Sequence, residues 1–400
     1  MRSGWAWCGL VAWCCLISFV HAEAPDVSPL LATLRAVGPQ GKGHQAASEA
    51  WAKLAKADAR QLPAILTAMD GADPLAANWI RAAVDAIAER ELAQGGKLPA
   101  ADLEKFLKDT RHNPRARRLA YEWIARVDTS APDRLIPQML DDPSVELRRD
   151  AVARLLDEAA RLKAADQADS PSGKATAVYE RALVAARDDD QIKLANDALK
   201  KAGRTFDLPR HFGFLMQWKL IGPFDNKDKK GFAVAYPPEE KIDLDATYTG
   251  SQGAAKWTDF ATSEDYGSVD LNKALGKLKG SLVYATAEFQ SRGDKPVELR
   301  IGTANAYKLW LNGKLIGQAN VYHSNLKLDQ YVSRAEMRAG RNVILLKICQ
   351  NEQTEDWAAD WQFQIRVCDA TGTAILSENR PSTATAANQP RDSGSAAKTE

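Results

Sequence analysis

The spacing of apolar residues changes near Phe206, and this change restricts the chain to a small set of folds. From Val27 to Arg204, Ala and Leu recur with a helical period, and Pro, Gly and Asp interrupt them at short intervals. After Phe206, aromatic and β-branched residues alternate with polar ones in short segments separated by turn residues. Helices followed by strands predict a multidomain α plus β protein, in which a helical domain precedes an antiparallel β-sandwich.

Three similar segments recur in the helical half. In each of them a short apolar helix leads to an Asp-Pro or Asn-Pro dipeptide and then to a longer amphipathic helix. The dipeptides are Asp73-Pro74, Asn113-Pro114 and Asp142-Pro143. Asp or Asn caps a helix, and Pro at the first helical position removes no hydrogen bond that the helix needs. The spacing of roughly 30 to 40 residues resembles HEAT repeats, so residues 25–205 are predicted as a HEAT-like domain. A plain helical bundle is the alternative.

Six segments of the second half have the composition and length of strands. They are residues 214–221, 282–289, 297–301, 307–311, 342–349 and 361–367. Asn312-Gly313 predicts a two-residue hairpin, because both residues tolerate a positive φ angle.

A family resemblance rests on four of these stretches. They are Trp218–Phe224, Leu309–Lys314, Ala339–Lys347 and Trp361–Phe363. Together they resemble the galactose-binding-like jelly-roll modules of secreted bacterial proteins and glycosidases. The resemblance implies a jelly-roll β-sandwich over residues 206–378. Many such modules bind carbohydrate, whereas many others only pack beside another domain.

Both ends of the chain differ from the rest in composition. Residues 1–22 have the basic start, the apolar run and the Val20-His21-Ala22 cleavage site of a signal peptide, which predicts a secreted or periplasmic protein. An uncleaved anchor is the alternative, although the run is shorter than the ~20 residues that span a bilayer. Residues 379–400 contain few apolar side chains and are expected to form a disordered tail.

The charge balance argues against some partners. Lys and Arg number 53 and Asp and Glu 52, which gives a formal net charge of +1. Nucleic acid and anionic membranes require an excess of positive charge, so neither is an expected partner. We expect no membrane span once the signal peptide is removed.

Motifs for catalysis are missing from the sequence. It contains no Gly-rich phosphate loop, no His-x-x-x-His pair and no Gly-x-Ser-x-Gly elbow. We therefore expect no catalytic residue, no metal site and no cofactor. A pair of carboxylates that hydrolyses glycosides stays open, because Asp and Glu are plentiful.

Two polar loops contain the candidate ligand-binding residues. Trp357 follows Asp356 in one loop, and Tyr322, His323 and Asn325 lie in the other. Exposed aromatic rings beside short polar side chains are what sugar recognition requires, so we predict stacking by Trp357 and Tyr322 and hydrogen bonds to Asn325 or Asp356. Trp310 either forms a further sugar platform or lies beneath a neighbouring domain.

Two functions follow as hypotheses. The first is an exported, non-catalytic binding protein whose sandwich recognises carbohydrate or a glycoconjugate. The alternative is a scaffold whose helical repeat surface binds another exported protein, with a purely structural sandwich.

A disulfide between Cys349 and Cys368 is also predicted. The other three cysteines lie within the predicted signal peptide. The alternation of apolar residues places Cys349 and Cys368 on the same face of two strands, which would form an antiparallel hairpin around the Trp357 loop. An oxidising compartment favours the bond, and two free thiols are the alternative.

Overall fold

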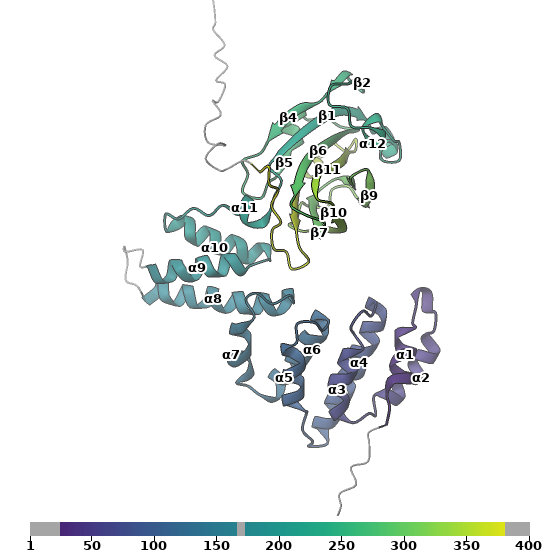
Figure 1. The fold of residues 1–400 in the computed structure, drawn as a ribbon, viewed down its shortest axis with the longest axis vertical. Helices are drawn as coiled ribbons and strands as arrows, with labels where there is room; N and C mark the ends of the chain where they lie inside the picture. Colours follow the sequence, from purple (N-terminus) through teal and green to yellow (C-terminus); the bar gives the residue numbers. More distant parts are fainter. Residues whose placement is uncertain (1–24, 166–172, 381–400) are drawn as a thin grey trace, which may run out of the picture. The chain divides into compact units, whose positions relative to one another are not determined.

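The computed structural model of the chain describes residues 25–165 and 173–380. The predicted signal peptide and, except for its first two residues, the predicted tail lie outside these described residues. The N-terminal half is helical, and the C-terminal part consists of antiparallel sheets (Figure 1). The chain divides into two compact units, the first ending at Pro132 and the second beginning at Asp133. Over the two described stretches, no helix combines the length and apolarity needed to cross a membrane.

Helices of the first unit pack in consecutive pairs, α1 with α2, α3 with α4 and α5 with α6. Each pair buries an apolar stripe, as expected for amphipathic helices around a shared core. The helices are α1 (Ser28–Arg35), α2 (His44–Leu54), α3 (Leu62–Thr67), α4 (Pro74–Ala93), α5 (Ala100–Lys108) and α6 (Pro114–Val127), with 3₁₀ turns η1 (Pro39–Gly41) and η2 (Ala59–Gln61) between them.

Two of the three predicted Asp/Asn-Pro helix starts are confirmed. The Asp73 carboxylate accepts hydrogen bonds from two backbone N–H groups in the first turn of α4, at 2.8 and 2.9 Å. The Asn113 side chain accepts one from the N–H of Arg115 at 2.9 Å, in the first turn of α6. The third start differs, because α8 (Val145–Ala165) begins after Pro143 and Ser144 accepts from a first-turn N–H at 3.5 Å.

The second unit contains both helices and sheets. The helices that precede its first strand are α8, α9 (Gly173–Ala185), α10 (Asp189–Lys201) and α11 (Leu208–Phe212), and α7 (Ala131–Leu135) and η3 (Ile136–Gln138) come before them. Apolar side chains of α8, α9 and α10 form one buried cluster with Leu208, Phe212 and Phe214. The division between the units therefore lies within the range 25–205, because the later helices bury their apolar faces against the start of the β region.

Every strand pairing in the β region is antiparallel. A six-stranded sheet has the order β4-β1-β6-β11-β8-β9, and a four-stranded sheet has the order β10-β7-β12-β5. In the larger sheet the strands are β1 (Gln217–Asp225), β4 (Thr258–Ala261), β6 (Ser281–Ser291), β8 (Ala306–Leu311), β9 (Lys314–Ala319) and β11 (Gly340–Gln350). In the smaller they are β5 (Val269–Asp270), β7 (Lys295–Thr303), β10 (Tyr331–Met337) and β12 (Gln362–Cys368). The six predicted strands correspond to β1, β6, β7, β8, β11 and β12.

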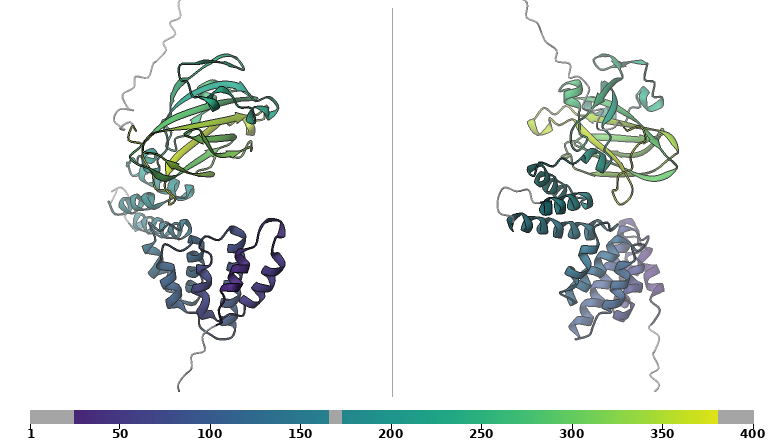
Figure 2. Two further views of the ribbon diagram at one scale, coloured as in Figure 1. Left: turned by 45° about the vertical axis from the view of Figure 1, so that its right-hand side comes forward. Right: turned by 60° about the vertical axis from the view of Figure 1, so that its left-hand side comes forward.

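Figure 2 shows the strands of the β region from two further sides. One apolar cluster takes side chains from both sheets. Trp218 on β1 and Phe363 on β12 meet in it edge to face, with ring centroids 5.1 Å apart. A polar segment between β1 and β4 contains η4 (Lys227–Phe232), α12 (Pro237–Glu240) and the hairpin of β2 (Thr247–Gly250) and β3 (Gly253–Lys256); α13 (Leu271–Leu275) and η5 (Asp356–Ala358) lie in later connections. The predicted hairpin turn is confirmed, because Asn312 (φ 52°) and Gly313 (φ 80°) join β8 to β9.

The predicted disulfide is wrong. Cys349 and Cys368 are both buried and unbonded. Cys349 lies on β11, which pairs with β6 and β8, whereas Cys368 lies on β12, which pairs with β5 and β7. The strands belong to different sheets and form no hairpin. Burial raises the pKa of the Cys349 thiol to about 12 and that of Cys368 to about 11, so both stay protonated at neutral pH.

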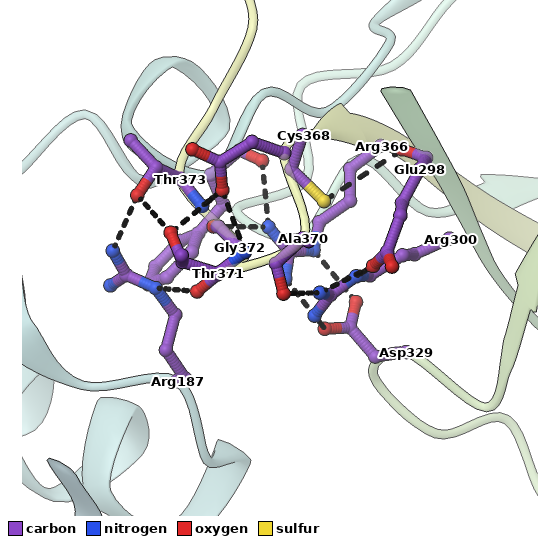
Figure 3. A network of polar contacts seen from close by, with 12 residues as sticks. Arg187, Glu298, Arg300, Asp329, Arg366, Cys368, Ala370, Thr371, Gly372 and Thr373 are labelled. Carbon is purple, nitrogen blue, oxygen red and sulfur yellow. Dashed lines mark hydrogen bonds and ion pairs between the residues drawn. The ribbon is translucent and has the colours of Figure 1, made fainter. Parts of the chain in front are cut away.

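A network of arginines and carboxylates joins the smaller sheet to the helices of the second unit (Figure 3). Arg366 on β12 donates two hydrogen bonds to Asp329, at 2.7 and 2.5 Å, and a further one to the carbonyl of Phe212 at 3.2 Å. Arg300 on β7 also donates to Asp329 at 2.7 Å. Arg187, just after α9, donates to the Thr371 carbonyl at 3.3 Å. We call these residues the seam network.

Gly372 lies at the centre of the seam network. Its φ of 77° belongs to the left-handed region, which favours glycine. A Cβ atom there would come within 3.1 to 3.2 Å of the side chains of Arg187, Arg300 and Arg366. A side chain at this position would therefore strain the backbone and would crowd the three arginines, which would have to shift by a few tenths of an ångström.

His211 on α11 is expected to make stability depend on pH. Burial, followed by the positive charge of Arg187, lowers the pKa of its imidazole, whose Nε2 lies 3.2 Å from the Val184 carbonyl oxygen. As the pH falls, the His211 imidazole therefore takes up a proton at a higher pH in the unfolded chain than in the folded chain. The stability of the fold should then decrease as the pH drops below about 6.5. We expect His211→Gln to reduce this slope in urea unfolding of the full chain between about pH 7 and pH 5. An unchanged slope would contradict the prediction.

Candidate functional site

The structure brings three of the five predicted ligand residues together. Tyr322 and His323 lie in the loop after β9, and Trp357 lies in η5, in the loop after β11. The rings of His323 and Trp357 meet edge to face, with centroids 5.1 Å apart and planes at 86°. The rings of Tyr322 and His323 have centroids 6.3 Å apart. We call these three residues the rim cluster.

Asn325 and Asp356 lie at its periphery. Both side chains are exposed. Asp356 directly precedes Trp357 at the start of η5, so its carboxylate is within the same loop. Among the residues that the structure describes, no hydrogen bond joins Asn325 to the rim cluster, and its predicted contact with a ligand stays a prediction.

The Trp357 indole is 63% exposed, the highest fraction among the large apolar side chains in the described part of the chain. Tryptophan is usually well buried, so an indole that remains in water is unusual. Such a ring is available to a ligand with an apolar face.

The orientation of His323 follows from its hydrogen bonds. Its Nε2 lies 2.8 Å from Oδ1 of Asn351. The Nδ2 of Asn351 donates to the side chain of Gln353 at 2.8 Å, and its Oδ1 accepts from the backbone N–H of Gln353 at 3.2 Å. Because Oδ1 is thereby assigned as an acceptor, Nε2 of His323 must carry a proton and donate.

Buried amide side chains support the loop that carries Trp357. Asn305 and Gln350 are both 1% exposed or less. Asn305 donates to the Gln350 side chain and to the Asp360 carbonyl, each at 3.1 Å. Gln350 donates to the carbonyls of Ala358 at 3.2 Å and Asp360 at 3.3 Å. Asn305, Gln350 and Asn351, which we call the amide network, thus fix the backbone on the C-terminal side of Trp357.

Two contacts hold the side chain of Tyr322, one at its hydroxyl group and one at its ring. Its hydroxyl accepts a hydrogen bond from the buried Asn226 at 3.3 Å. The ammonium of Lys229 lies 5.1 Å from its ring centroid, within the range of a cation–π contact. Burial raises the pKa of Tyr322 to about 12, so the hydroxyl stays protonated and is able to donate. The rim cluster therefore offers rings and neutral hydrogen-bonding groups.

A second hollow, which sequence reasoning missed, lies on the outer face of the six-stranded sheet. It is a groove of about 750 Å³, here called the sheet groove. Lys219, Thr286, Leu345 and Trp310, which are cross-strand neighbours on β1, β6, β11 and β8, line its floor. Its walls come from residues 238–244 and from residues 375–380. Trp310 is only 8% exposed, because the chain's own segment 226–257 packs against it.

Ion pairs line the groove. Lys219 pairs with Asp259 at 2.5 Å, and Arg341 pairs with Glu288 at 2.5 Å. On the wall, Oε1 of Glu239 accepts from the fully buried Lys347 at 2.8 Å and from the hydroxyl of Tyr284. Burial lowers the pKa of Lys347, whereas the neighbouring carboxylate of Glu239 acts against that shift.

The floor of the groove could have been predicted from the alternation of polar and apolar residues along its strands. Lys219 on β1 and Thr286 and Glu288 on β6 are polar residues that alternate with buried apolar ones, which indicates a sheet face turned to solvent. The walls of the groove could not be predicted in this way, because they come from segments that are distant in the sequence. Within the described residues, no group of three or more His, Cys, Asp or Glu side chains is placed to hold a metal ion.

Comparison with known proteins gave no family. No family model matches the chain, and no curated protein matches it. Among solved structures, a GH31 α-xylosidase from Xanthomonas citri is 13% identical, with 31% of this chain and 18% of that chain covered and a TM-score of 0.17.

Two structures of a β-glucosidase from Kluyveromyces marxianus also match, one in complex with glucose and one labelled with selenomethionine. They are 9% and 10% identical, each with 71% of this chain and 36% of that chain covered and a TM-score of 0.25. The chain spans well under half the length of these proteins, and at such TM-scores the likeness carries no argument.

Proposed function

We propose that the chain is an exported, non-catalytic carbohydrate-binding protein in which a jelly-roll sandwich presents the rim cluster to a sugar. The observation that supports this most is the exposure of Trp357 above the buried amide network. An indole in water is stabilised when it stacks on an apolar face, and the loop that carries it is already ordered by hydrogen bonds. Little conformational freedom is then lost on binding.

The chemistry around Trp357 favours a sugar over other small ligands. A pyranose ring has an apolar face for the indole and hydroxyl groups at its edge. The hydroxyl of Tyr322 and the carboxylate of Asp356 supply a donor and an acceptor for such groups. A single shallow platform predicts weak binding, and a millimolar constant corresponds to about 4 kcal/mol.

Replacing Trp357 with alanine tests the proposal. In a glycan array probed with the full chain, followed by titration of the sugars that bind, we expect Trp357→Ala to weaken binding about tenfold or more. The melting temperature should hardly change, because the indole is 63% exposed. Trp357→Phe should retain part of the affinity.

Leu194→Ala serves as a control, since this side chain is 50% exposed on α10. It should leave both binding and stability unchanged. Binding of wild type to no glycan on the array overturns the proposal, as does binding that survives Trp357→Ala. A large loss of stability in Trp357→Ala would show instead that the indole serves the fold.

A further inference from the structure

We propose that the sheet groove is a second carbohydrate site, which takes a length of neutral polysaccharide. This inference rests on the proposed function, and it extends the ligand from a single sugar at the rim cluster to a polymer.

The charges of the groove nearly cancel. Its acidic side chains are Asp207, Glu239, Glu240, Asp259 and Glu288, and its basic ones are Lys219, Arg338, Arg341 and Arg380. Lys347, buried behind Glu239, adds one more positive charge. A polyanion or a polycation would gain little from so balanced a surface, and this favours an uncharged ligand.

Fixed polar groups face this ligand. Glu239 accepts hydrogen bonds from Lys347 and Tyr284, and both of them reach the same carboxylate oxygen, Oε1. Its Oε2 has no hydrogen-bond partner among residues 25–165 and 173–380, so one carboxyl oxygen of this groove-wall residue remains available to a ligand. On the floor, the ion pairs of Lys219 and Arg341 hold donors and acceptors side by side. Hydroxyl groups both donate and accept, and they match such alternating groups.

An apolar strip runs beside these groups. Val343 on β11, which is partly exposed, and Leu244 on the wall, which is 38% exposed, present most of it, and the nearly buried Leu345 and Trp310 lie beneath. Sugar rings have apolar faces that fit such a strip. A purely apolar ligand would also cover the ion pairs. It would displace the water bound to them without offering hydrogen bonds in return, and this desolvation costs free energy.

Position and size point to a polymer. The groove of about 750 Å³ lies in the upper part of the range for small-molecule sites. Val343 lines the groove, whereas Asn351 supports the rim cluster at the other end of β11. Asn351 comes eight positions after Val343, which in extended chain corresponds to about 26 Å. One sugar cannot occupy both sites, but a polysaccharide is able to engage both and gain affinity from this.

Filling the groove tests the inference. Ala261, exposed on β4 and lining the groove, is replaced with Trp, and the matched control is Ala254→Trp, exposed on β3 and outside the groove. Leu244→Asp is a second groove variant with a different chemistry. Full-length proteins are run in native gels containing hydroxyethylcellulose, galactomannan or arabinoxylan, and melting temperatures confirm that each variant folds.

Ala261→Trp and Leu244→Asp should each weaken retention by the bound polysaccharide about tenfold or more, because one of two linked sites is lost. Titration with the monosaccharide that the rim cluster binds should be unchanged in both, and Ala254→Trp should behave as wild type. If only Trp357→Ala weakens retention, the proposed function stands and the groove site is overturned. If no polysaccharide or sugar binds wild type, the proposed function fails first. A groove that binds peptides, and not polysaccharide, also overturns the inference.

Discussion

Replacing Arg366 with methionine should destabilise the second unit by about 3 kcal/mol or more, because it removes one partner of a buried ion pair. The Arg366 side chain is 1% exposed, and Asp329 is 18% exposed. Without Arg366, Arg300 is the remaining cationic partner of the Asp329 carboxylate within the described residues, and the carbonyls of Phe212 and Gly372 lose a donor. Urea unfolding of the full chain, followed by tryptophan fluorescence, measures the change.

Arg334→Met is the matched control. Arg334 pairs with Glu298 at 3.2 Å, and Glu298 in turn accepts hydrogen bonds from Arg300 of the seam network, but the Arg334 side chain is 85% exposed. Exposed pairs contribute about 0 to 1 kcal/mol, so this variant should unfold almost as wild type does. Equal destabilisation by the two variants would show that burial is not what makes the Arg366 pair important.

The same pair should also make the protein sensitive to acid. Burial acts to raise the pKa of Asp329, but the hydrogen bonds and charge of Arg366 outweigh it, and the pKa lies below its usual value. The stabilisation is therefore present above the pKa of the unfolded state and is lost as the pH falls through the lower pKa of the folded state. Arg366→Met should weaken this dependence.

Replacing Lys347 with methionine should destabilise the protein by a similar amount, about 3 kcal/mol. Lys347 is fully buried, and it ties segment 226–257 to β11 through Glu239 and through the carbonyl of Val234 at 2.7 Å. Its loss leaves the Glu239 carboxylate, 11% exposed, with the hydroxyl of Tyr284 as its partner. The free energy of unfolding in urea again measures the effect.

The double variant Lys347→Met/Glu239→Gln separates charge from packing. Removing both charges leaves no unpaired ion, so we expect the double variant to be more stable than Lys347→Met alone. A double variant that is less stable than either single variant would show that packing under segment 226–257, and not the ion pair, determines the effect.

Predictions from the sequence succeeded where the controlling forces act between residues close in the chain. The caps at Asp73 and Asn113 and the hairpin at Asn312-Gly313 depend on hydrogen bonds and backbone preferences within a few residues. The exposure of Trp357 follows from a polar loop around it in the same way. The third cap shows the limit, since Ser144 takes the place expected of Asp142.

The disulfide prediction failed for a different reason. Alternation along a strand tells which face a side chain occupies, but it does not tell which strand lies beside it. Cys349 and Cys368 are close in sequence, yet β11 and β12 joined different sheets because both bury their inward faces in the core between the sheets.

The candidate sites show the same division between local and tertiary information. The local sequence was enough to predict that Tyr322, His323 and Trp357 lie in polar loops, because each loop lacks the apolar period of a strand. The contact of His323 with Trp357 could be seen only once the chain was folded, since it joins two connections that lead from the larger sheet to the smaller one, β9 to β10 and β11 to β12. The sheet groove and the seam network are wholly tertiary. Their charged side chains pair with residues on strands, turns and helices that are distant in the chain. The pattern of residues along the sequence does not show which of these distant residues are close in space.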